Sequence, residues 1–152
     1  MSSIKLLISS FEGAHAELLK GNDYIPGKKR AWKPETATRS AIEILNHVSY
    51  WNHFFARPLD GKANLQTPED EWISSKSEMQ TAEGAREAAE KASHLFLKAL
   101  STLSDKQLSD EVALPWGKAS LQQVILSNYN HLSYHIGQLN YIQTLLGDGE
   151  SH

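Results

Sequence analysis

The chain has 152 residues, of which 40% are hydrophobic and 22% are charged, and its formal net charge at pH 7 is -3. This composition is typical of a soluble globular protein, and we expect residues 1–152 to form a single domain. The acidic balance argues against a nucleic-acid partner, because phosphate-binding proteins usually carry a basic patch. The absence of cysteine excludes disulfides, thiolate metal sites and cysteine nucleophiles.

Apolar residues recur at three- and four-residue spacing along four long stretches, which predicts four helices. The predicted helices cover residues 3–20, 38–56, 81–103 and 120–146. Ser40 with Glu43, and Ser120 with Gln123, form candidate capping boxes where the second and fourth helices begin. No convincing pair of strands is evident. The predicted fold class is therefore all-α, a four-helix bundle.

Three connectors join these helices. Residues 21–37 are long for a link in a compact bundle, which predicts a long crossover between helices 1 and 2. Residues 57–80 are expected to be irregular, with a short helical turn opening at Pro68. Residues 104–119 form the third connector, and residues 112–117 within it are expected to be extended and then to turn.

Three histidines form the candidate functional site. His131 and His135 are four residues apart, so they lie one turn apart on one face of the fourth helix. His47 lies in the second helix in a matching context, because Asn-His-Val-Ser-Tyr-Trp at 46–51 parallels Asn-His-Leu-Ser-Tyr-His at 130–135. We predict that His47, His131 and His135 converge on one divalent metal ion. Three imidazoles leave a coordination position open and suit zinc, nickel, copper or iron, of which we expect zinc or nickel.

Other polar residues fit this site less well. Helical spacing places His53 about 240° from His47, which excludes it from the same face. The roles of His15 and His94 stay open. Glu43 shares a face with His47, so it either orients that ligand or is an exposed helical glutamate. A plain helical bundle with structural histidines is the alternative to a metal site.

No stretch approaches 18 consecutive apolar residues, so no membrane span and no membrane partner are expected. The N-terminal residues lack the basic start, apolar run and cleavage site of a signal peptide. These features predict a cytoplasmic protein.

Taken together, the motifs resemble the DinB/YfiT-like family of bacterial four-helix-bundle metalloenzymes. The resemblance covers most of the chain and rests on Trp32-Lys33-Pro34, His47, Gly117, Ser120, His131, His135, Gly137-Gln138 and Leu146-Gly147. Many family members carry an arginine directly after the last histidine, where this chain has Ile136. The resemblance implies a divalent metal bound by His47, His131 and His135.

Relatives in that family include bacillithiol S-transferases and mycothiol-dependent isomerases. The resemblance therefore implies a metal-dependent enzyme, a thiol S-transferase that joins a low-molecular-weight thiol to a small-molecule substrate. Such a thiol would supply the nucleophile that the cysteine-free chain lacks. The alternative is a non-catalytic metal-binding module of a stress response. No catalytic residue beyond the metal ligands is identified, although Tyr50, Tyr134 and Gln138 lie near the ligands in sequence.

We also expect a homodimer formed through exposed apolar helix surface. The four tryptophans and the alanine-lined helix positions motivate this expectation. Relatives in the family are often dimeric, which the resemblance implies for this chain as well.

Overall fold

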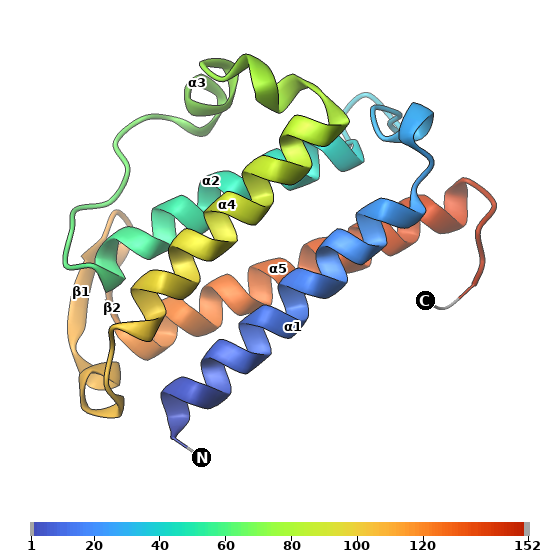
Figure 1. Cartoon of the computed structure of the whole chain (residues 1–152). Coiled ribbons are helices and arrows are strands. Elements are labelled where there is room, and N and C mark those ends of the chain that lie inside the picture. The colour runs from blue at the N-terminus through green and yellow to red at the C-terminus, as the bar shows by residue number, and fades with distance from the viewer. Residues whose placement is uncertain (1, 151–152) are drawn as a thin grey trace.

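The computed structural model describes residues 2–150, and four long helices dominate it. Figure 1 shows how they are arranged. Its elements are α1 (Ser3–Tyr24), α2 (Ala41–Leu59), α3 (Glu69–Ser74), α4 (Ala82–Ser101), β1 (Glu111–Leu114), β2 (Gly117–Ser120) and α5 (Leu121–Leu145). Short 3₁₀ turns cover Gly27–Lys29, Ser77–Gln80 and Asp105–Ser109. The predicted all-α bundle is confirmed, with α1, α2, α4 and α5 as its four helices. No helix within residues 2–150 is both long and apolar enough to cross a membrane.

Side-chain caps fix where the long helices begin. The two predicted capping boxes, Ser40 with Glu43 and Ser120 with Gln123, are both present. The carboxylate of Asp105 accepts hydrogen bonds from the first two backbone N–H groups of α1, at 3.1 and 2.9 Å. Each cap satisfies amide groups that have no partner inside the helix. The Asp105 cap also ties the start of α1 to the segment that follows α4.

The first helix extends past its predicted end. The sequence predicted that the helix ends at residue 20, before Gly21 and Asn22, but α1 continues to Tyr24. Gly21 faces α5, where an added Cβ atom would lie 3.4 Å from Oδ1 of Asn140. The glycine thus serves close packing between two helices rather than a helix stop.

The long crossover lies between α2 and α4, which corrects the prediction that it joins helices 1 and 2. In Figure 1, α2 and α4 run parallel to each other and antiparallel to α1 and α5. Asn46 near the start of α2 donates a 2.7 Å hydrogen bond to the carbonyl of Met79, just before α4. Residues 60–81 must therefore return along the length of the bundle. The link from α1 to α2 stays at one end, where Ile42 N–H donates to the Arg30 carbonyl.

A two-stranded antiparallel hairpin precedes α5, although no strand pair was expected. The register pairs Glu111 with Ser120 and Leu114 with Gly117. The chain reverses at Pro115-Trp116, and Gly117 takes a φ of 138° that favours glycine. Strands of four residues are too short to produce a clear alternation in sequence. The predicted extended segment and turn at residues 112–117 lie within this hairpin.

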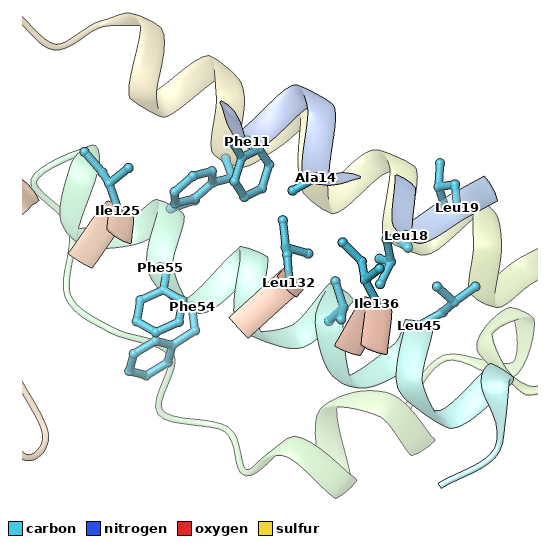
Figure 2. Packing of buried hydrophobic residues seen from close by; sticks show 14 of the residues in the cluster. Phe11, Ala14, Leu18, Leu19, Leu45, Phe54, Phe55, Ile125, Leu132 and Ile136 are labelled. Carbon is cyan, nitrogen blue, oxygen red and sulfur yellow. The ribbon is translucent and has the colours of Figure 1, made fainter. Parts of the chain in front are cut away.

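Figure 2 shows the apolar core between the helices. The labelled residues come from α1 (Phe11, Ala14, Leu18, Leu19), α2 (Leu45, Phe54, Phe55) and α5 (Ile125, Leu132, Ile136). All of them are buried, and each large apolar side chain contributes about 1.5–3 kcal/mol through removal from water. Leu132 and Ile136 flank His135 in α5, so their packing fixes the direction in which this histidine points.

Candidate metal centre

The structure brings His47 of α2 together with His131 and His135 of α5. The Nε2 atom of His131 lies 2.9 Å from that of His47 and 3.0 Å from that of His135. All three can present one ligand nitrogen within 4.8 Å of the others, and this group could hold a metal ion. His135 is buried, and His47 and His131 are partly buried. The antiparallel packing of α2 and α5 creates the cluster, because it places the middle of one helix against the middle of the other.

Two of the histidines are oriented through their other ring nitrogen. Nδ1 of His47 lies 2.5 Å from the carboxylate of Glu69, which can only accept, so the imidazole donates. Nδ1 of His135 lies 2.7 Å from the amide oxygen of Gln138, which also accepts. A neutral imidazole with a protonated Nδ1 carries its lone pair on Nε2. Both Nε2 lone pairs therefore point toward the centre of the cluster.

The donor set fits a cation. With His47 and His135 neutral, a single N–H on Nε2 of His131 could satisfy only one of its two neighbours, which leaves facing lone pairs. A divalent ion would accept all three lone pairs at once. Nitrogen atoms bound about 2.1 Å from one ion lie roughly 3 to 3.4 Å apart. Two of the nitrogen–nitrogen distances, 2.9 and 3.0 Å, are close to the lower end of this range, and the whole group lies within 4.8 Å. A carboxylate on the far nitrogen of a ligating histidine is also a common feature of zinc sites.

Burial keeps the imidazoles of His131 and His135 neutral. Desolvation, followed by the neighbouring His135, His47 and Arg39, lowers the pKa of His131 to about 3. Desolvation likewise lowers the pKa of His135 to about 4, against an opposing contribution from the Gln138 hydrogen bond. Neutral imidazole is the form that binds metals. These two histidines can therefore ligate at neutral pH without first releasing a proton.

The carboxylate of Glu69 is held in its charged form. Burial alone would raise its pKa, but the hydrogen bond from His47 and the charge of Arg39 lower it. A charged Glu69 makes the Nε2 atom of His47 a stronger electron-pair donor to a metal ion.

Aromatic side chains enclose one side of the cluster. The Trp51 ring lies 6.2 Å from the His47 ring and 6.0 Å from the His131 ring, centroid to centroid. Trp116, from the hairpin turn, contacts Trp51 at 6.2 Å and is 61% exposed. Such a wall lowers solvent access to the ligands. Tyr134 touches the edge of His135 from the exposed face of α5.

The remaining sequence candidates lie elsewhere. His53 contacts Trp72 and is outside the cluster, as predicted. His15 is buried beside Phe11 and bonds to the Ala89 carbonyl, and His94 is exposed on α4. Neither belongs to the three-histidine group. His152 lies outside the described residues.

Glu69, and not Glu43, is the carboxylate that contacts His47. Glu43 is committed to the α2 capping box and to a 2.6 Å ion pair with Lys33. The short helix predicted to open at Pro68 is present as α3, and its first residue is the carboxylate that reaches His47. Its sequence signal is weak, because residues 69–71 are all acidic and nothing local distinguishes one from another.

The comparisons with known proteins agree with this architecture. A sequence model described as the DinB superfamily matches residues 10–139. A crystal structure of a DinB-like protein from Bacillus subtilis has 18% identity and a TM-score of 0.72, with 97% of this chain and 96% of that chain covered. A conserved protein from Enterococcus faecalis has 15% identity and a TM-score of 0.72, with 95% and 97% covered. No curated protein matches the chain. The sequence match over most of its length shows that the chain belongs to the DinB superfamily.

Proposed function

We propose that this protein is a metal-dependent enzyme that joins a low-molecular-weight thiol to an electrophilic small molecule. The observation that carries the proposal is the convergence of the Nε2 atoms of the three histidines. In His47 and His135 the other ring nitrogen, Nδ1, is hydrogen-bonded to Glu69 and to Gln138, respectively. His47, His131 and His135 would hold the ion, with zinc or nickel as the expected metals.

Three protein ligands are typical of catalytic metal sites, whereas structural zinc sites use four. The chain has no cysteine, so a thiol nucleophile must come from outside. A bound divalent ion would lower the pKa of such a thiol and so raise the fraction of thiolate at neutral pH. Glu69 and Gln138 would keep the imidazoles of His47 and His135 in place during turnover.

The proposed reaction is a nucleophilic substitution. The thiol releases its proton to solvent, and the sulfur forms a bond to an electrophilic carbon of the substrate. The bond from that carbon to the leaving group breaks, and the leaving group departs with the electron pair. No oxidant or reductant is required. The aromatic wall of Trp51 and Trp116 supplies an apolar surface for the electrophile.

The test is conjugation of bacillithiol, cysteine or glutathione to 1-chloro-2,4-dinitrobenzene. The rate of conjugate formation is measured from the change in absorbance. We expect the metal-loaded protein to exceed the uncatalysed rate, and the metal-stripped protein to match it. His135→Ala should lose both metal and rate, and His53→Ala, which changes a histidine outside the cluster, should retain both. Activity that survives verified metal removal would contradict the mechanism.

The same experiment separates the second candidate function, a metal-binding module without turnover. The converging histidines by themselves require only that an ion binds. If the metal-loaded protein gives the uncatalysed rate with every thiol and several electrophiles, the binding module becomes the better account. Elemental analysis of wild type and His135→Ala decides whether any metal is held at all.

A further inference from the structure

We propose that Arg39 is a specificity-determining residue that binds the carboxylate of a small, partly apolar anionic substrate. This inference rests on the proposed function, because it places that substrate beside the three-histidine cluster. The site is a hollow of about 310 Å³ between α2 and α5, covered by residues 34–39.

The hollow adjoins the cluster. Gln138 lines it and also accepts the hydrogen bond from Nδ1 of His135. Ile44, on the other wall, precedes His47 by three residues on the same helix. A ligand in the hollow would therefore lie along the groove between the two helices that supply the histidines.

The lining suits an anion with an apolar body. Among the described residues that line the hollow, Arg39 is the only charged one. Ile44 and Ile142 supply apolar surface, and Gln138 and Tyr141 supply polar groups at the edge. A guanidinium binds a carboxylate through two parallel hydrogen bonds, which gives both strength and orientation.

Arg39 makes no hydrogen bond and no ion pair within the part of the chain that the structure describes, residues 2–150. The other three arginines do: Arg30 donates to the Ile25 carbonyl, Arg57 to the Ala63 carbonyl, and Arg86 to Asp23 and Glu90. The neighbouring cation Lys33 is paired with Glu43 at 2.6 Å. Arg39 thus remains available to a ligand.

The charge of Arg39 also reaches the cluster. It contributes to lowering the pKa of His131, of His135 and of Glu69. Because Arg39 and Gln138 line the same hollow and Gln138 contacts His135, a carboxylate bound to Arg39 can place its other end near the histidines.

The inference is tested by calorimetric titration of metal-loaded and metal-stripped protein with 3-phenylpropionate and with octanoate. The uncharged amide of each acid is the ligand control. We expect wild type to bind the acids at least tenfold more tightly than the amides, in both metal states. Arg39→Gln should lose that preference, and Arg39→Lys should recover part of it. Lys33→Gln removes a cation from the same loop that is already paired, and it should behave as wild type.

Tyr141→Ala tests the location, because it should weaken acid and amide alike. Metal content, measured in every variant, should be unchanged by Arg39→Gln, so loss of the metal site is distinguished from loss of the carboxylate site. Binding that disappears on metal removal and ignores Arg39→Gln would mean that the acid coordinates the metal, and would overturn the inference. Absence of saturable binding to wild type, or equal binding of acids and amides, would overturn it as well.

Discussion

Glu69 controls the orientation of His47 through a single hydrogen bond between its carboxylate and Nδ1 of the imidazole. Removal of such a partner typically lowers metal affinity by about 10- to 100-fold. We therefore predict that Glu69→Ala weakens zinc binding by a factor in this range, measured by competition with a chromophoric chelator. Asp70→Asn changes the adjacent exposed carboxylate and is the matched control. Equal affinity in both variants would show that Glu69 does not support the site.

The buried histidines predict how the stability of the metal-stripped protein depends on pH. In the folded protein the pKa values of His131 and His135 are about 3 and about 4, against an ordinary value of 6.5. Between these values and 6.5 the unfolded chain binds more protons than the folded chain, so the free energy of unfolding falls as pH falls through this window. Above pH 6.5 the two histidines no longer lower the free energy of unfolding.

We expect urea unfolding of metal-stripped protein to show this decrease between pH 7 and pH 4.5. His131→Gln should show a shallower decrease, because it removes one of the groups that must take up a proton on unfolding. The metal-loaded protein should lose its ion over the acidic part of the range, since imidazolium cannot ligate. A wild-type pH profile that is flat, or that matches the profile of His131→Gln, would contradict this prediction.

The residues of the candidate site differed in how well the sequence predicted them. His131 and His135 were predictable because i,i+4 spacing within one helix fixes their relative position. His47 was predictable from its matching sequence context, and the structure does place it with the other two. Glu69 and Arg39 were not, because they lie in or beside the connectors. Their distance from the cluster depends on how the chain packs between the helices, which no local pattern records.

At the scale of single elements, the start of α4 leaves no room for a side chain at Gly84. A Cβ atom added to Gly84 would lie 1.7 Å from the backbone carbonyl oxygen of Glu78, so the 3₁₀ turn before the helix would have to move. We predict that Gly84→Ala destabilises the protein by about 1–3 kcal/mol. Gly13→Ala, in α1, meets nothing within 4 Å and should stabilise it by about 0.5–1 kcal/mol. Thermal unfolding of the two variants should shift in opposite directions, and shifts of the same sign would contradict the packing at Gly84.

Helices and connectors were not equally predictable from sequence. The capping boxes of α2 and α5 were located correctly because each depends on residues three apart. The hairpin was missed because its strands have only four residues each. The crossover was misplaced for a different reason. A connector's length does not say whether its ends meet at one end of the bundle or at opposite ends. Residues 25–40 fold back on themselves, whereas residues 60–81 span the bundle.

At the scale of the whole molecule, the antiparallel pairing of α2 with α5 matters most for function. It sets His47 opposite His131 and His135, and it also aligns Ile44 with Gln138 and Tyr141 along the hollow beside the cluster. The parallel pairing of α2 with α4 leaves the long return segment to carry α3, and with it Glu69, to the histidines. These two pairings together assemble the three histidines and the carboxylate that contacts His47.

The outer surface of the bundle bears on assembly, which we still propose to be a homodimer. Among the alanines that motivated this expectation, Ala85, Ala89 and Ala99 of α4 are buried, so they provide no interface. Exposed apolar surface lies instead on α5, where Tyr134 and Tyr141 are 65% and 64% exposed. They are seven positions apart, which places them on one face of the helix.

Leu145, 44% exposed and four residues after Tyr141, continues this face. Exposed apolar surface of this kind often marks a protein interface. We predict that light scattering gives twice the monomer mass and that Leu145→Glu shifts the equilibrium toward monomer, because a charge would be buried in the interface. Leu6→Glu changes another exposed apolar residue, on α1, and should leave the dimer intact. A monomer mass across a wide range of protein concentrations would reject the homodimer, and an equal effect of both substitutions would place the interface elsewhere.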